Sequence, residues 1–397
     1  MRRWNYFLPA LMLALALSAC APAGTQTSPP PSGQPSQGPG PSNTERTAPS
    51  WDETDWSGHL ELDYAQSFAV DYSPEGYKRI TIDTETYLVV PELAPVPEGT
   101  PEDVTVLRQP IQNIYLQATA AMDCFRKLDA LDAVTLVGTD ASGWYLPEVK
   151  EAMAAGRMAY AGKYSAPDYE LLQARGCGMA LESTMIYHNP EVKEQLERLG
   201  IPVLVERSSY ESHPLGRMEW VKLYGVLLNR EEEAGAYYEE QLARLEPVLE
   251  RENTGKTVAF FAVTANGMVT VRKPGDYIAK AIGLAGGVYA LNGLGGEENA
   301  LSTMNIQMES FYEMARDADI LIYNSAIESA LDSLEQLVDK SPPLAEFKAV
   351  REGNVWCTGK SMFQESQSAG EMMLDIHRIL TEGHGADGSL AYLYRLT

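Results

Sequence analysis

Cationic residues stand at two places where a predicted strand gives way to a helix. Arg272 and Lys273 precede a helix expected over residues 276–284. Arg108 stands in the same relation to the first helix of its own half. Helix N-termini attract anions, and a guanidinium binds carboxylate or catecholate oxygens through charge-assisted hydrogen bonds. These positions predict contacts to an anionic ligand, although charged residues at helix starts are often only solvated.

Motifs for catalysis or for a bare metal ion are missing. The sequence has no H-E-x-x-H and no G-x-S-x-G. Its five histidines include one pair at helical spacing, His377 and His384. Three cysteines follow residue 20 without C-x-x-C spacing, so we expect free thiols; a Cys124 to Cys177 disulfide is the alternative. His213 is better explained as a helix cap than as a metal ligand.

The first twenty residues predict export and lipidation. Arg2 and Arg3 precede an apolar run over residues 7–17, which suits a secretory signal but is short of the roughly 20 residues of a membrane span. Cys20 follows two small residues, as in the lipobox of bacterial lipoproteins. We predict a signal peptide over residues 1–19 and acylation of Cys20. The alternative is an ordinary secretory signal with a chance cysteine.

Low-complexity sequence follows Cys20. Pro, Ser, Gly, Gln and Thr dominate it, so residues 20–55 are predicted to be a disordered tether. The formal net charge of the chain is −24. Such an acidic chain is repelled by nucleic-acid phosphates and by anionic lipid heads, so neither is an expected partner.

The remaining length predicts two α/β lobes, over residues 56–213 and 255–397. β-Structure is expected first, at residues 67–71, 77–83 and 86–90. Strands at 104–107, 133–137, 178–181 and 203–205 then alternate with helices such as 111–128 and 190–199. In the second lobe, strands at 257–263, 320–323 and 354–356 alternate with helices at 276–284, 307–316, 343–350 and 366–380. This alternation is typical of parallel sheets covered by helices.

A largely apolar helix is expected between the lobes. Leu215, Met218, Val221 and Leu228 share one face, and other apolar residues cover much of the rest. A helix of this kind is contacted on several sides. We predict a connecting helix and a following helix over residues 214–254. The alternative is a core helix of one larger domain.

The order of these pieces resembles the class III solute-binding proteins of ABC importers for iron-siderophores, haem and cobalamin. The likeness covers about residues 71–380. It rests on the connecting helix with LLNREEEA at 227–234, GKTVAFF at 255–261 and DYIAKAIGLAGG at 276–287. The resemblance implies two lobes, each a mainly parallel sheet with flanking helices, joined by one long rigid linker helix. It implies no enzymatic activity and no cofactor.

The family binds its ligand between the lobes, in loops where strands give way to helices, as open α/β sheets generally do. Aromatic rings suit the flat skeleton of a chelate, and arginines suit its anionic oxygens. The resemblance thus implies ligand contacts from Arg108, Tyr115, Trp144, Tyr145, Lys163, Tyr187, Tyr210, Asn266, Met268, Arg272, Lys273, Tyr289, Tyr323 and Phe363. For any one tyrosine, half-buried packing is the alternative.

The function implied by the resemblance is capture of a ferric-siderophore-like complex and its delivery to an ABC permease. The protein would be a monomer, lipid-anchored on the extracytoplasmic face of the cell membrane. Family members dock on the permease through an acidic residue of each lobe; the candidates are Glu191 or Glu194 and Glu309 or Glu313. Alternatives are cobalamin, haem with Tyr210 or His213 as axial ligand, or a surface sensor or enzyme on the same frame.

Overall fold

The structure, a computed structural model, describes residues 48–295 and 303–397. The predicted signal peptide, Cys20 and the tether up to residue 47 lie outside the described residues. The fold begins earlier than predicted, because Trp51 N–H donates to Glu98 O at 2.8 Å and the Trp51 ring lies 5.4 Å from that of Trp56. No helix in the described ranges is long and apolar enough to cross a membrane.

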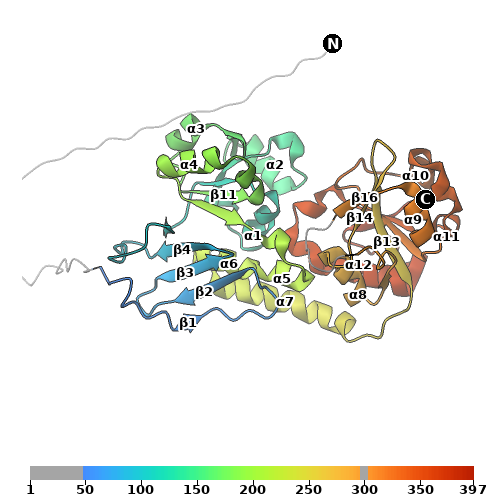
Figure 1. The fold of residues 1–397 in the computed structure, drawn as a ribbon, viewed down its shortest axis with the longest axis horizontal. Coiled ribbons are helices and arrows are strands. Elements are labelled where there is room, and N and C mark those ends of the chain that lie inside the picture. The colour runs from blue at the N-terminus through green and yellow to red at the C-terminus, as the bar shows by residue number, and fades with distance from the viewer. Residues whose placement is uncertain (1–47, 296–302) are drawn as a thin grey trace, which may run out of the picture. The chain divides into compact units, whose positions relative to one another are not determined.

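A five-stranded sheet opens the N-terminal lobe (Figure 1). Its strands, in spatial order, are β1 (Gly58–His59), β2 (Phe68–Tyr72), β3 (Lys78–Ile82), β4 (Glu85–Val90) and β5 (Val104–Arg108). All neighbours are antiparallel except β4 and β5. Ile80 and Ile82 are buried while Arg79 and Thr81 are only half-buried, so the period-2 pattern places one face of β3 in the core. The predicted β-structure at the start of the fold is confirmed.

A second sheet of the same lobe is parallel throughout, in the order β12-β11-β6-β7-β8. The strands are β6 (Ile114–Leu116), β7 (Val134–Val137), β8 (Ala159–Tyr160), β11 (Met179–Ser183) and β12 (Val203–Glu206). The helices are α1 (Met122–Lys127), α2 (Pro147–Ala154), α3 (Tyr169–Ala174) and α4 (Pro190–Arg198), and β9 (Gly162–Lys163) pairs with β10 (Ala166–Pro167).

The helix expected over 111–128 is wrong in its first half, where the chain forms β6. Ile114, Tyr115 and Leu116 are all buried, because β6 lies in the middle of the sheet with side chains packed on both faces. A short continuous apolar run of this kind cannot be told from a buried helix by its period. Only α1 remains of the predicted helix.

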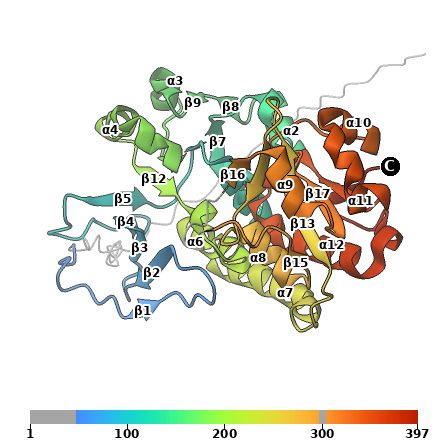
Figure 2. The same ribbon diagram turned by 45° about the vertical axis from the view of Figure 1, so that its right-hand side comes forward.

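The C-terminal lobe carries a seven-stranded mixed sheet (Figure 2). Its strands are β13 (Thr257–Val263), β14 (Val269–Arg272), β15 (Val288–Tyr289), β16 (Thr303–Ile306), β17 (Ile320–Tyr323), β18 (Val355–Thr358) and β19 (Leu393–Arg395). β15, β13, β17 and β18 pair in parallel, and β14, β16 and β19 add antiparallel edges. The helices are α8 (Tyr277–Leu284), α9 (Met308–Ala315), α10 (Leu334–Lys340), α11 (Lys348–Arg351) and α12 (Ala369–Glu382).

Three helical pieces connect the lobes: α5 (Pro214–Glu219), α6 (Val221–Leu228) and α7 (Glu231–Leu249). The predicted single helix over 214–228 is interrupted at Trp220. The indole of Trp220 is bound to Glu211 and packs on Phe68 of the N-terminal lobe, whereas α5 contacts α8 and α12 of the C-terminal lobe. The connecting segment is therefore held from both sides at its break. The predicted cap is confirmed, since Nδ1 of His213 accepts from Leu215 N–H at 3.3 Å.

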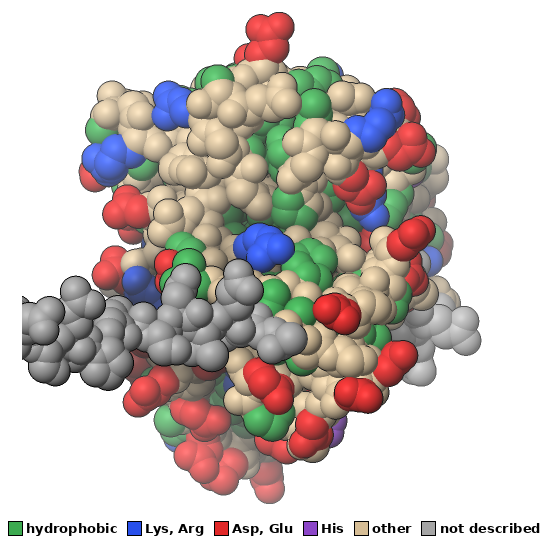
Figure 3. Space-filling model, turned by 90° about the vertical axis from the view of Figure 1, so that its left-hand side faces the viewer, with side chains coloured by type: hydrophobic (Ala, Val, Ile, Leu, Met, Phe, Trp, Pro, Cys, Tyr) green, Lys and Arg blue, Asp and Glu red, His purple; other side chains and the backbone are tan. Residues whose placement is uncertain are grey.

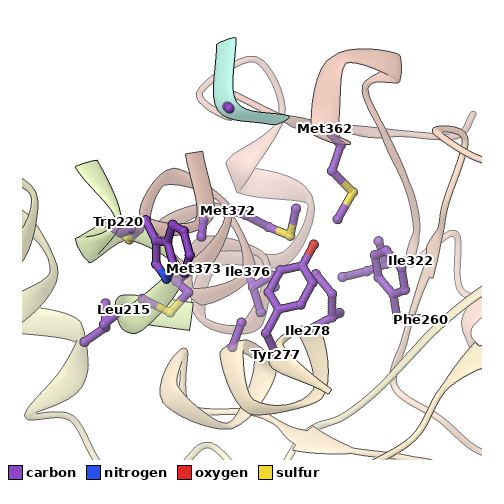
Figure 4. Packing of buried hydrophobic residues seen from close by; sticks show 14 of the residues in the cluster. Leu215, Trp220, Phe260, Tyr277, Ile278, Ile322, Met362, Met372, Met373 and Ile376 are labelled. Carbon is purple, nitrogen blue, oxygen red and sulfur yellow. The ribbon is translucent and has the colours of Figure 1, made fainter. Parts of the chain in front are cut away.

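Apolar side chains join α5 to the C-terminal lobe. Figure 4 shows Leu215 and Trp220 beside Met372 and Met373 of α12, with Tyr277 of α8 close to them. All belong to one hydrophobic cluster that also contains residues of the N-terminal lobe. Burial of large side chains stabilises such a cluster by roughly 1.5–3 kcal/mol each, so the connection is a packed core and not a flexible hinge.

Gly225 marks the closest approach of α6 and α7. A methyl group added there would lie 2.6 Å from Cβ of Ala234 and 2.9 Å from the carbonyl oxygen of Arg230. We expect Gly225→Ala to lower the free energy of unfolding by about 1–3 kcal/mol, because overpacked groups must shift. Urea denaturation followed by circular dichroism measures this.

Gly235 of α7 supplies the matched control. Nothing lies within 4 Å of a methyl group added there, so Gly235→Ala should stabilise the helix by about 0.5–1 kcal/mol. Equal stability of the two variants would show that α6 and α7 do not pack this closely.

Candidate functional site

The junction of the connecting segment with the C-terminal lobe contains a small polar pocket. It is lined by Arg217 of α5, Tyr277 of α8, and Met362, Phe363, Glu365, Ser366, Ser368, Ala369 and Met372. Its volume is about 20 Å³. Ligand sites usually enclose several hundred Å³, so this pocket is too small to be a complete site, and we refer to it as the floor pocket.

Arg217 is a buried cation at this floor. Its side chain is 8% exposed, its guanidinium lies 3.9 Å from the ring centre of Tyr277, and Nη1 donates to Ser209 O at 3.1 Å. No carboxylate of the described residues lies within 4 Å of it. Burial raises the pKa of Glu206, and the charge of Arg217 partly opposes that rise. A guanidinium stacked on a ring with free N–H groups is suited to bind an anionic ligand atom.

A second arginine lies behind Phe363. Arg272 ends β14, and its guanidinium lies 5.6 Å from the ring centre of Phe363 and 3.3 Å from Asp276. Asp276 also caps α8 by accepting from Ile278 N–H at 2.8 Å. Burial raises the pKa of Asp276, and Arg272 lowers it. The predicted anion site at the start of α8 is thus occupied by the chain's own carboxylate.

One segment of the C-terminal lobe reaches across to the N-terminal lobe. Oε1 of Gln364 accepts from Tyr145 N–H at 2.8 Å, and its Nε2 donates to Gly143 O at 2.7 Å. The next residue, Glu365, accepts from Arg126 of α1 at 2.8 Å. A single side-chain amide therefore holds the loop between β7 and α2.

Buried polar groups of α1 complete this contact between the lobes. Arg126 donates to Oδ1 of Asp123 at 2.9 and 2.7 Å, and Gln367 N–H donates to Oδ2 at 2.9 Å. Nε2 of Gln367 lies 3.3 Å from Sγ of Cys124. Cys124, Cys177 and Cys357 are free, so the expectation of unpaired thiols is confirmed. Burial raises the pKa of the Cys124 thiol.

Exposed apolar side chains follow the carboxyl ends of three strands in the parallel sheet. Tyr145 comes after β7, Tyr160 ends β8, and Met185 and Tyr187 come after β11; they are 42%, 47%, 45% and 45% exposed. Ligands of open α/β sheets bind at the carboxyl ends of strands. These side chains therefore offer an apolar surface at the expected edge.

Four of the predicted ligand contacts are buried in the cores: Tyr115, Trp144, Tyr289 and Tyr323, which are 0%, 0%, 4% and 0% exposed. Tyr115 and Tyr323 lie inside strands, where their rings pack between sheet and helices. Trp144 donates to Thr139 O at 3.0 Å, and Tyr289 to Arg272 O at 2.6 Å. The prediction is corrected for these four, because they present almost no surface to a ligand.

The other predicted contacts are dispersed. Arg108 is exposed at the end of β5 in the first sheet, and Lys163 is exposed in β9. Asn266 and Met268 form the turn between β13 and β14, and Lys273 is half-buried beside Arg272. Tyr210 donates to Thr184 at 3.3 Å, beneath Arg207. Of the predicted set, the structure brings Arg272 and Phe363 into contact. It also hydrogen-bonds the backbone N–H of Tyr145 to the side chain of Gln364, the neighbour of Phe363.

Two residues of the site escaped the sequence analysis, namely Arg217 and Tyr277. The sequence did contain a sign of Arg217, since a charged residue in a largely apolar helix must be paired or hydrogen-bonded when the helix is buried. The candidate docking residues Glu191 and Glu194 on α4, and Glu309 and Glu313 on α9, are all exposed and stay predictions.

Larger cavities, of about 390 to 500 Å³, lie elsewhere, and the one of about 390 Å³ lies beside the connecting segment. It borders the amino end of β6 and the end of α6, and its polar lining includes Asp129, Asp132, Asn229 and Arg230 without any aromatic residue. The amino ends of parallel strands are not where such sheets bind ligands. We therefore take the junction, and not this cavity, as the candidate site.

Solved structures share this architecture. The periplasmic haem-binding protein of Pseudomonas aeruginosa superposes with a TM-score of 0.54 at 15% identity, over 72% of this chain and 98% of that one. HutB of Vibrio cholerae, also a periplasmic haem-binding protein, gives 0.53 at 18% identity, over 66% and 98%. This chain has the class III periplasmic-binding-protein fold. The class III fold also describes the ABC-type Fe3+-hydroxamate transport protein of Saccharomonospora viridis, with 0.53 at 20% identity over 70% and 94%. All three neighbours are binding or transport proteins.

Sequence comparison finds lipoproteins among the relatives of this chain. Two uncharacterized lipoproteins of Methanocaldococcus jannaschii are 26% identical over 245 residues and 25% identical over 218 residues. The matches cover 60% and 52% of this chain, and they span about half the length of those relatives, 56% and 53%. No family model matches the chain. The relatives are lipoproteins and the structural neighbours are periplasmic proteins.

Proposed function

We propose that this chain is the lipid-anchored solute-binding protein of an ABC importer, which captures an iron-siderophore-like chelate between its lobes and delivers it to a membrane permease. The class III fold, the lipoprotein relatives and the Fe3+-hydroxamate neighbour support this proposal. Acidic side chains spread over the lower part of the face in Figure 3, consistent with a surface that does not bind nucleic acid. The ligand leaves chemically unchanged.

The pairing of buried guanidinium groups with aromatic rings at the junction carries the proposal. Arg217 lies on Tyr277 and has no carboxylate partner among the described residues, whereas Arg272, which faces Phe363, is already paired with Asp276. Rings give a planar chelate apolar contact, and arginines bind its carboxylate or catecholate oxygens. Because the floor pocket admits little more than one water, the chelate would rest above it, against the exposed ring of Tyr145.

A ligand panel tests the proposal. The purified chain is titrated with ferric catecholates, ferric hydroxamates, haem and cobalamin, with tryptophan fluorescence and visible absorbance as readouts. We expect saturable one-to-one binding of a ferric chelate, recovered unaltered. If only haem or cobalamin binds, the proposed ligand is wrong but the chain is still a solute-binding protein. Turnover of a bound compound would overturn the proposal.

Arg217→Met is expected to weaken binding of that chelate by about 30- to 100-fold, because hydrogen bonds to a charged partner contribute about 1.5–3 kcal/mol. Arg217→Lys keeps the charge and should lose less. Arg175→Met, at an exposed arginine after α3, is the matched control and should bind as the wild type does. Circular dichroism shows that each variant is folded; equal affinity of the folded Arg217→Met variant would contradict the assignment.

Haem is the second candidate ligand, favoured by the haem-binding neighbours and by exposed tyrosines that could act as axial ligands. His213 is an unsuitable axial ligand because its ring caps α5 and stacks on Tyr64 at 4.7 Å. A Soret band that disappears with Tyr145→Phe or Tyr160→Phe would favour haem over a siderophore.

A further inference from the structure

The ring centre of Tyr145 lies within 6 Å of the ammonium groups of two lysines that come from different lobes. Nζ of Lys150, on α2, lies 5.8 Å from the centre of the Tyr145 ring. Nζ of Lys360, which begins the 3-10 turn Lys360–Phe363, lies 5.9 Å from the same centre. An exposed ring flanked by two ammonium groups can accept a planar group that carries negative charge.

Both lysines lack an acidic partner. Among the residues that the structure describes, neither has a carboxylate oxygen within 4 Å, although the chain has a formal charge of −24. Of the acidic residues near this segment, Glu148 and Glu365 are engaged by Arg126 at 3.5 and 2.8 Å. The ammonium groups are therefore available to an incoming anion.

Gln364 fixes this arrangement. Its amide binds both Gly143 O and Tyr145 N–H, so a C-terminal-lobe side chain sets the loop that presents the Tyr145 ring. Gln364 lies four residues after Lys360 and is only 8% exposed. The two lysines and the ring thus keep their relative positions only while the lobes are in contact.

We propose that Tyr145, Lys150 and Lys360 form a subsite for an anionic aromatic group of the ligand, such as a catecholate or benzoate ring, and that Gln364 is its positioning residue. The subsite rests on the proposed function and deepens it, because it selects among chelates by charge. The ring of the ligand stacks on Tyr145, and its oxygens face the lysines. A neutral hydroxamate complex gains little from the same groups.

Two iron complexes of different charge test the subsite. The chain is titrated with the ferric complex of 2,3-dihydroxybenzoate, which is anionic, and with ferric acetohydroxamate, which is neutral. We expect Lys150→Ala and Lys360→Ala each to weaken binding of the anionic complex by about 10-fold, and to leave the neutral complex within about 2-fold. Lys340→Ala, on α10, is the matched control and should change neither affinity.

The outcomes separate the subsite from the proposed function. The subsite is overturned if both lysine variants bind the anionic complex with unchanged affinity. It is also overturned if the wild-type protein binds the neutral complex but not the anionic one. In both cases the proposed importer function still stands. If neither ferric complex binds, the same variants are titrated with haem, whose propionates are anionic. If the lysine variants bind haem more weakly than the wild type does, the subsite is supported and the iron-chelate proposal fails. If their affinity for haem is unchanged, or if haem does not bind, the subsite is overturned as well.

The role of Gln364 has its own readout. Gln364→Ala should weaken the anionic complex by about 10-fold and speed hydrogen exchange at the Tyr145 amide, which loses its acceptor. Gln364→Glu keeps the acceptor oxygen and should restore slow exchange. Gln336→Ala, which removes a local contact to Asp332 within the C-terminal lobe, should leave both unchanged. Slow exchange in Gln364→Ala would show that Gln364 does not position Tyr145.

Discussion

Glu182→Gln is expected to raise the free energy of unfolding at pH 8.5 by up to about 5 kcal/mol. Glu182 of β11 is 0% exposed, and neither carboxylate oxygen has a hydrogen-bond partner among the described residues. Burial raises its pKa from 4.5 to about 8. Since one pKa unit corresponds to about 1.4 kcal/mol, the ionised side chain costs the folded state several kcal/mol that glutamine does not.

The effect has a defined pH window. Below pH 4.5 the carboxyl is neutral in both the folded and the unfolded chain, so the wild type keeps its full stability. As the pH rises from there to about 8, the unfolded chain loses its proton first and the wild type becomes less stable. The two proteins should therefore differ little at pH 4.5 and diverge steadily up to pH 8.

Urea denaturation at several pH values measures this divergence. Glu182→Met should behave as glutamine does or be more stable, since it also removes the unpartnered polar atoms. Glu194→Gln is the control, at an exposed glutamate of α4. A constant difference between wild type and Glu182→Gln across the window would mean that Glu182 is ionised in the fold and has a partner.

Arg126→Ala is expected to lower the free energy of unfolding by about 3–5 kcal/mol. It leaves Asp123, which is 0% exposed, without its main counter-charge. It also removes the contact to Glu365 across the lobes. Because burial already raises the pKa of Asp123, loss of the arginine should raise it further, and part of the lost stability should return in acid.

A second substitution distinguishes charge from packing. Asp123→Asn combined with Arg126→Ala should recover part of the loss, since the charge of Asp123, the more buried of the two carboxylates at Arg126, is then removed. Arg198→Ala serves as control, because its pair with Glu194 is more than 60% exposed on both sides and should contribute almost nothing. If Arg126→Ala costs as little as Arg198→Ala, the contact between α1 and the C-terminal lobe does not hold the lobes together.

Strong local patterns in the sequence predicted much of the fold. The strand expected at 257–263 is found as β13, because six of its seven apolar and β-branched residues are buried, on both faces of the strand. The helix at 190–199 is found as α4, where Pro190 starts it and Val192 and Leu196 are buried. By contrast β16 (Thr303–Ile306) gave no signal, since an edge strand with polar residues has no apolar run.

The site was harder to predict than the fold. A tyrosine inside a short strand and one in a loop that follows a strand look alike in sequence, yet Tyr115 is 0% exposed and Tyr145 is 42% exposed. Arg217 gains its role only because α5 packs beside α8, and Lys360 only because Gln364 holds a loop of the other lobe. Contacts of this kind join positions more than fifty residues apart, and no local periodicity encodes them.

The thiol of Cys124 can report how often the two lobes separate. It is covered by Gln367 at 3.3 Å and by Ser366 at 3.9 Å, both on the segment that crosses between the lobes. A thiol reagent can reach it only while that segment is displaced. In a variant with the half-buried Cys177 replaced by serine, the rate of thiol labelling at Cys124 reports how often the two lobes separate. A ligand that bridges the lobes should lower this rate.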